Sequence, residues 1–213
     1  MKLHSFFRSS AAYRVRIALG LKGLAYDYSA VQIAKGRQFD APFAAINPQS
    51  LVPVLEQDDG QRLTQSLAIV EYLEETHPSP PLLPATALGR HRVRSLALLV
   101  ACEIHPLNNL RVLKYLTDVL KVTEEQKLAW YGHWVTTGLE ALERRLASEA
   151  ETGSFCHGDS PGLADLCLVP QLANARRFSV DLAPYPSLLR IDAVCADLPA
   201  FRAALPAAQP DAV

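Results

Sequence analysis

The chain has 213 residues, of which 49% are hydrophobic, and its formal net charge is −1. This length is sufficient for one large domain or two small ones with a buried core, so a globular protein is expected. A nearly neutral chain does not suit a nucleic-acid surface, which needs clustered cations. No unbroken apolar run approaches the ~20 residues of a membrane span, and no signal-type segment opens the chain. We therefore expect a cytoplasmic protein with neither a nucleic-acid nor a membrane partner.

The cysteines and histidines do not indicate a metal site. All four cysteines fall in the second half of the chain without the close pairing of a redox motif or a zinc site. The six histidines show no ligand-like spacing either. We expect no metal, and cysteines that are reduced and mostly buried, namely Cys102, Cys156, Cys167 and Cys195.

The first 80 residues mix strand and helix patterns. Gly23 is typical of a residue just beyond a helix, and the sequence Asp58-Asp59-Gly60 predicts a hairpin turn. The order of the elements predicts a small mixed sheet covered by helices. Strands are predicted at 2–7, 26–31, 54–57 and 61–64, and helices at 11–22, 38–46 and 66–76.

A second, helical domain is predicted beyond a proline-rich segment. Residues 77–89 contain four prolines, too many for a continuing helix, and mark the domain boundary. Pro106 should kink the first helix that follows. The predicted fold is an α/β N-terminal lobe, residues 1–82, and an all-α C-terminal domain, residues 88–213. Its helices are predicted from apolar periodicity at 90–118, 124–149 and 163–174.

Four local sequences together carry a family resemblance. They are SSAAYRVRIAL at 9–19, NP at 47–48 with LVP at 51–53, QSLAI at 65–69, and ADLCLVPQ at 164–171. In this order, over nearly the whole chain, they resemble the zeta class of glutathione transferases. The resemblance implies a thioredoxin-like glutathione-binding domain at 1–82, a helical substrate-binding domain at 88–213, glutathione as cofactor, and a homodimer.

Two positions depart from the family pattern. Ala11 stands where the pattern has a cysteine, so chemistry that needs a protein thiol there is absent. Gly162 stands where a serine or threonine would cap a helix, although Asp165 can still accept the backbone N–H there. The first departure disfavours a glutaredoxin-like activity, and the second concerns stability.

Ser9 is the first candidate for a group that stabilises a glutathione thiolate. By position alone, Ser9 and Ser10 are most simply explained as the cap of a helix. Lowering a thiol pKa by two units needs about 2.7 kcal/mol. A helix terminus supplies ~0.3–2 kcal/mol and a hydrogen bond to a charged sulfur ~1.5–3 kcal/mol, so the two together suffice. The resemblance implies this role for Ser9, with Ser10 and Arg8 beside it as further catalytic candidates.

Three further segments are implied in glutathione binding. Val52-Pro53 resembles the cis-proline turn that offers its backbone to a bound peptide, although a trans proline in an ordinary turn is commoner. Gln65-Ser66 opens a predicted helix, whose N-terminus can bind the γ-glutamyl carboxylate or can simply be capped. The resemblance adds three residues near Pro106, which could equally have structural roles: His105, Asn108 and Asn109.

Three arginines are candidates for binding a dicarboxylate substrate, because arginine matches carboxylate geometry bidentately. They are Arg8, Arg111 and Arg176, although a solvated role is as reasonable for Arg176, next to Arg177. The resemblance implies cis–trans isomerisation of a maleyl keto acid, maleylacetoacetate or maleylpyruvate, in aromatic catabolism. The alternatives are a conjugating glutathione transferase or dehalogenase, and a non-catalytic interaction protein with the same fold.

Overall fold

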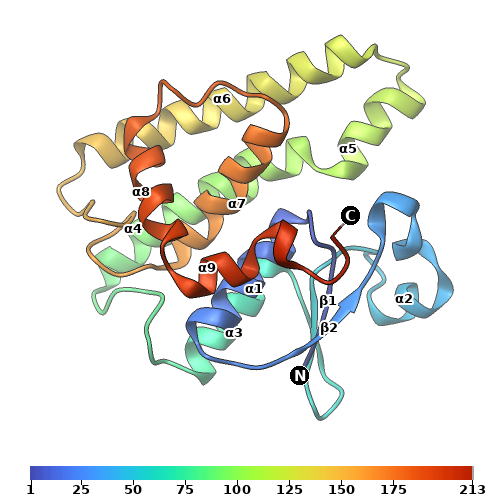
Figure 1. Ribbon diagram of the computed structural model, residues 1–213, viewed down its shortest axis with the longest axis horizontal. Helices are drawn as coiled ribbons and strands as arrows, with labels where there is room; N and C mark the ends of the chain where they lie inside the picture. The colour runs from blue at the N-terminus through green and yellow to red at the C-terminus, as the bar shows by residue number, and fades with distance from the viewer. Residues whose placement is uncertain (213) are drawn as a thin grey trace. The chain divides into compact units, whose positions relative to one another are not determined.

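The computed structural model describes residues 1–212, and the chain forms two compact units (Figure 1). The N-terminal unit comprises Met1–Leu82 together with the C-terminal segment that starts at Ala196. The helical unit comprises Leu83–Cys195. The α/β and all-α fold classes are confirmed. The predicted second domain at 88–213 differs from the helical unit at its end, because the last helix packs against the N-terminal unit.

The N-terminal unit contains a four-stranded mixed sheet in the order β2-β1-β3-β4. Its strands are β1 (Lys2–Ser5), β2 (Asp27–Ala30), β3 (Val54–Glu56) and β4 (Arg62–Thr64). β1 is parallel to β2 and antiparallel to β3, which is antiparallel to β4. His4 lies opposite Val54, and Val54 lies opposite Thr64. The chain therefore leaves β1, enters β3 and leaves β4 at the same end of the sheet.

The helices of this unit are α1 (Ser10–Leu21), α2 (Ala41–Ile46), α3 (Ser66–Thr76) and α9 (Pro199–Ala204), with short 3-10 turns at Ile33–Lys35, Arg37–Phe39 and Pro206–Ala208. α1 packs against both α3 and α9, and α2 lies on the other side of the sheet (Figure 1). A Cβ built on Gly20 of α1 would lie 3.2 Å from the Cβ of Ala200 in α9. This close approach is why the C-terminal segment belongs to the N-terminal unit.

The helical unit contains α4 (Ala87–Leu98), α5 (Leu110–Lys114), α6 (Glu124–Ser148), α7 (Leu163–Arg177) and α8 (Pro186–Ala196). Between α4 and α5 the helix changes to a π turn, Leu99–Ile104, and a 3-10 turn, His105–Asn108, and a second π turn, Tyr115–Val119, follows α5. This irregular stretch confirms the predicted interruption at Pro106. Gly138 of α6 lets the helices approach closely, because an added Cβ would lie 2.3 Å from Ile104.

The helical stretch Ala87–Val119 spans 33 residues, with a mean hydropathy of 1.2 over its most apolar window, so by length and composition it could cross a membrane. Parts of it pack against α6 and α7, and a single helix of this kind is weak evidence for a membrane. Only 33% of that window is buried. The stretch is interrupted by Glu103, His105 and Asn108, so it is not an unbroken apolar run.

The cap of α7 agrees with the sequence analysis. Gly162 provides no side-chain cap, and its N–H donates to the carboxylate of Asp165 over 2.8 Å. The second oxygen of Asp165 accepts the N–H of Cys156 over 2.9 Å. Asp165 is 1% exposed, and this burial raises its pKa. Two backbone donors compensate for its burial and fix the loop that precedes α7.

Candidate active site

Ser9 lies in the turn between β1 and α1 and caps the helix. Its Oγ accepts the N–H of Ala12 over 3.2 Å, and its own N–H donates to the carbonyl of Phe6 over 2.9 Å. The first turn of α1 carries no acidic side chain, so the positive end of the helix dipole is not neutralised there. The Ser9 side chain is partly exposed, and its hydroxyl proton has no acceptor among residues 1–212. A sulfur placed beside it could accept that proton as a hydrogen bond.

Ser10, the first residue of α1, has a different environment. It is 4% exposed and already has an interaction within the protein. Ala11 follows it and is partly buried. Of the two serines, Ser9 is therefore the one with a hydroxyl available to a ligand.

Two residues that the sequence analysis did not single out brace the turn before Ser9. Arg16 is 1% exposed, and it donates to the carbonyl of Phe7 over 3.0 Å and to the Ala204 carbonyl over 3.1 Å. Asp211 accepts the Phe7 N–H over 3.2 Å. Burial lowers the pKa of Arg16, which has four acceptors to satisfy its guanidinium. Arg16 lies within the RVRIAL sequence, but no local pattern marks Asp211.

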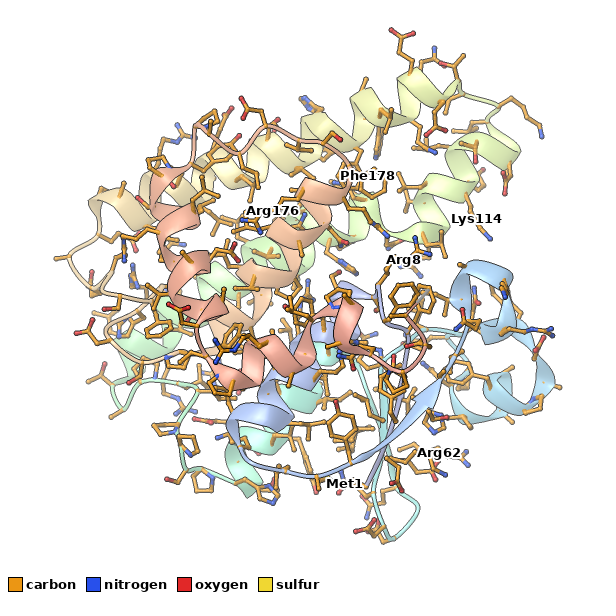
Figure 2. All side chains as sticks on the ribbon, viewed as in Figure 1. Met1, Arg8, Arg62, Lys114, Arg176 and Phe178 are labelled. Atoms are coloured by element: carbon orange, nitrogen blue, oxygen red, sulfur yellow. The ribbon has the colours of Figure 1, made fainter. Side chains whose placement is uncertain are left out.

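Arg8 precedes Ser9 and extends from this turn (Figure 2). It is exposed, and its guanidinium carbon lies 4.7 Å from the ring centroid of Phe7 and 5.9 Å from that of Phe6. Cation–π contacts of this kind orient the side chain and leave the N–H groups at the guanidinium edge available. Arg8 is thus held close to Ser9 without a carboxylate partner among the described residues.

The peptide bond between Val52 and Pro53 is cis, which confirms the prediction for this turn. Val52 is 8% exposed and packs with Phe6, Phe7 and Val54 in one apolar cluster. Neither its N–H nor its carbonyl forms a hydrogen bond with any other residue between 1 and 212. This short length of backbone can pair with an extended peptide in the manner of an added strand.

Gln65 and Ser66 open α3 at the same end of the sheet. Gln65 has a φ of 67°, an uncommon backbone conformation for a residue other than glycine, and its side chain donates to Gln49 over 2.9 Å. Ser66 is 7% exposed, and its Oγ accepts a hydrogen bond from Arg14 over 3.3 Å. Arg14 was not predicted as a site residue. A carboxylate at this helix start would meet N–H donors and a hydroxyl.

The β-strand register brings three of the predicted segments together. His4, Val54 and Thr64 lie in one row across the sheet. Ser9 follows β1, Val52 precedes β3 and Ser66 follows β4, so these residues gather at one end of the sheet.

The predicted residues around Pro106 have distinct environments within the helical unit. Asn109 caps α5 by accepting the Val112 N–H over 3.1 Å, so its carbonyl oxygen has a structural role. Both polar atoms of the Asn108 amide are buried without a partner in the described part of the chain. His105 is partly buried and already has an interaction, and Arg111 is exposed. Asn108 is the member of this group whose hydrogen-bonding capacity is unused.

Arg176 extends from the C-terminal end of α7 and is labelled in Figure 2. Its guanidinium donates to the carboxylate of Asp192 over 2.6 Å, and its side chain is 48% exposed. Arg177 instead lies over the ring of Phe178, 4.8 Å from the centroid, and Phe178 stacks on Tyr131 at 3.9 Å. A substrate carboxylate at Arg176 would have to share the guanidinium with Asp192. That these residues of the helical unit contribute to one substrate site with Ser9 stays a prediction.

Neither metal ligation nor a reactive thiol is evident in the part of the chain that the structure describes. No group of three or more potential ligands forms there. The four cysteines are free, and all except Cys102 are buried. Burial raises the pKa of Cys156 well above its ordinary value. The three buried thiols are therefore not accessible to a substrate.

Comparisons with known proteins agree with this geometry. Family models for the glutathione S-transferase N-terminal domain and C-terminal domain match residues 3–81 and 135–208. Maleylpyruvate isomerase of a Ralstonia species is 51% identical over 211 residues, which is 99% of each chain.

Two solved structures are similar over the whole chain. The holo structure of a maleylpyruvate isomerase, a bacterial zeta-class glutathione S-transferase, is 51% identical with a TM-score of 0.97, and each chain is covered completely. Maleylacetoacetate isomerase of Anaeromyxobacter dehalogenans, with dicarboxyethyl glutathione and citrate in its active site, is 50% identical with a TM-score of 0.89, covering 100% of this chain and 97% of that one. The chain therefore belongs to the glutathione S-transferase family, within the zeta class of maleylacetoacetate and maleylpyruvate isomerases.

Proposed function

We propose that this chain is a glutathione-dependent isomerase that converts maleylacetoacetate to fumarylacetoacetate, or maleylpyruvate to fumarylpyruvate, in aromatic catabolism. The observation that carries the proposal is the state of Ser9. Its oxygen caps α1, while its proton remains available at the end of the sheet where Val52 and Ser66 also lie. Membership of the zeta class supports the same chemistry.

The residues of the N-terminal unit fit glutathione as a cofactor. The unpaired backbone of Val52 suits the cysteinyl peptide group, and Ser66 at the start of α3 suits the γ-glutamyl carboxylate. Ser9 would then face the sulfur. For the glycine end of the tripeptide we assign His105, Asn108 and Asn109 on the family resemblance alone.

Bound glutathione would supply a thiolate that adds reversibly to the cis double bond, so that the former double bond rotates before the thiolate leaves and the trans alkene forms. Ser9 lowers the thiol pKa by donating a hydrogen bond to the charged sulfur beside the positive end of α1. Arg16 and Asp211 keep this donor in place by fixing the turn before it. No residue of the chain needs to act as a nucleophile.

The arginines would hold the carboxylates of the substrate without locking the bond that rotates. Arg8 immediately precedes Ser9 in the same turn and has no carboxylate partner among residues 1–212. Arg111 is exposed near the irregular turn after α4. Arg176 must divide its donors between the substrate and Asp192. Arginines that bind the substrate carboxylates would stabilise the negative charge that develops during the reaction.

A homodimer in the cytoplasm completes the proposal. Two large apolar side chains of α4 are exposed, Leu88 at 75% and Leu98 at 44%. Leu98 also lines a surface hollow together with His91 and Cys102. An exposed apolar surface of this kind is typical of a protein interface, so we place the dimer contact here.

The test follows the loss of the cis-enol absorbance of a maleyl keto acid when the protein is added with glutathione. We expect loss of this absorbance with the keto acid and slow or no conjugation of a neutral chloro-aromatic acceptor. A conjugating transferase would show the reverse preference, and a non-catalytic protein would accelerate neither reaction. Either of those results would contradict the proposed function.

A further inference from the structure

Arg14 is a buried cation whose hydrogen bonds are mostly unmade. It lies on α1 and is 2% exposed. Its Nη1 donates to the Oγ of Ser66 over 3.3 Å. Its Nε and Nη2 have no hydrogen-bond partner among residues 1–212, and no described carboxylate forms an ion pair with it. Since an uncompensated buried charge is costly, the position of this guanidinium needs an explanation.

Other buried cations of the same unit are compensated. Arg16, two residues further along α1, donates to Ser5 and to the carbonyls of Phe6, Phe7 and Ala204. Lys22 forms an ion pair with Glu74 over 2.6 Å and also donates to two carbonyls. Arg14 differs from both because its one partner is a neutral hydroxyl at the start of α3. An anion at that helix start would supply the missing counter-charge.

The hydrogen bond to Ser66 has a direction that matters. Because the guanidinium can only donate, Ser66 Oγ must accept from Arg14. The hydroxyl proton of Ser66 is then left to donate elsewhere, and the neighbouring cation makes that proton a better donor. The N-terminus of the 11-residue helix α3 adds unpaired backbone N–H groups at the same place. Charge, hydroxyl and helix terminus therefore favour the same kind of ligand, a carboxylate.

We propose that Arg14 is a positioning residue for carboxylate binding at Ser66, and that the carboxylate is the one on the γ-glutamyl end of glutathione. The inference rests on the proposed function for the identity of the ligand. Arg14 does not touch that ligand, because the unpartnered nitrogens are enclosed by protein. It acts through Ser66 by directing the hydroxyl outward and by placing a positive charge behind it.

The test compares glutathione with an analogue that lacks only this carboxylate, 4-aminobutyryl-cysteinylglycine, by calorimetry. For Arg14→Met we expect the dissociation constant of glutathione to rise by about 10- to 150-fold, the equivalent of a hydrogen bond to a charged group. The constant of the analogue should change by less than about threefold. Arg14→Lys, which keeps the charge, should restore part of the loss.

Controls separate this role from a structural one. Circular dichroism checks that each variant is folded, and if Arg14→Met does not fold, the same ratio is measured for Arg14→Lys and Arg14→Gln. In a Ser66→Ala background, Arg14→Met should cost less than it does alone, because the two residues act together. Equal losses for glutathione and the analogue, or no loss for either, would overturn the proposal.

Failure of this inference can be distinguished from failure of the proposed function. A wild-type protein that discriminates between the two peptides through Arg14 but turns over no keto acid supports the inference and contradicts the isomerase proposal. A wild-type protein that isomerises the keto acid, with an Arg14→Met variant that loses affinity for both peptides alike, supports the isomerase proposal and contradicts the inference.

Discussion

Ser9→Ala is the substitution that examines the proposed thiolate site most closely. Two interactions are lost, because Ser9 Oγ accepts the Ala12 N–H and its proton is available to a bound sulfur. The helix cap is worth about 1 kcal/mol of stability, and the hydrogen bond to a charged sulfur about 1.5–3 kcal/mol. The second loss should raise the pKa of the bound thiol by about one to two units, since one unit corresponds to about 1.4 kcal/mol.

We expect turnover of a maleyl keto acid to fall at least about tenfold at neutral pH, with glutathione affinity largely retained, because the backbone contacts of Val52 remain. Ultraviolet absorbance of the thiolate against pH gives the pKa of the bound thiol directly. Ser9→Thr keeps both the cap and the hydroxyl and is the matched control, while Ser10→Ala should have a much smaller effect. Equal losses at Ser9 and Ser10, or an unchanged thiol pKa in Ser9→Ala, would refute the assignment.

Three further predictions concern substrate binding and stability. Met in place of Arg111 or Arg176 should raise the Michaelis constant for a maleyl dicarboxylate by the equivalent of about 1.5–3 kcal/mol. Asp192→Asn removes the carboxylate that pairs with Arg176 and should lower that constant. Unchanged constants in all three variants would show that these residues do not contact the substrate. Asp165→Ala leaves the N–H groups of Cys156 and Gly162 without their acceptor. The free energy of unfolding, measured with urea, should fall by about 2–5 kcal/mol, and by less for Asp165→Asn. A fall of less than about 1 kcal/mol for Asp165→Ala would contradict this role. Hydrogen bonds from Arg145 and Arg92 lower the pKa of Glu149. The contribution of Glu149 to stability is therefore present above the unfolded pKa of about 4.3 and is lost as pH falls through the folded pKa. Glu149→Gln should flatten this acid dependence of the urea midpoint, and an unaltered profile would contradict the prediction.

Local patterns predicted the elements that depend on neighbouring residues in the sequence. α3 starts and ends at the predicted Ser66 and Thr76, because a turn residue precedes it and the apolar spacing is regular. Gly23 has the positive φ of 65° that a helix C-terminal glycine commonly adopts. Helix periodicity also located α6 to within one residue. These features require no knowledge of distant parts of the chain.

Long-range packing was beyond such patterns. The helices α8 and α9 were not predicted, and nothing local to α9 shows that it packs against α1. Arg14 and Arg16 look alike in the sequence Arg-Val-Arg, yet Arg16 has four acceptors and Arg14 has only the hydroxyl of Ser66. The difference arises from partners as distant in sequence as Ala204. The candidate site was predicted mainly from the family resemblance, and its supporting residues came from the fold.

The central claim is that glutathione acts as a cofactor at Ser9 and is not consumed. The most direct measurement is the amount of fumaryl keto acid formed per glutathione, with free thiol measured before and after the reaction. The account predicts many product molecules for each glutathione, an undiminished thiol concentration, and no acceleration when S-methylglutathione replaces glutathione. Consumption of one glutathione for each product, or an equal rate without a free thiol, would contradict it.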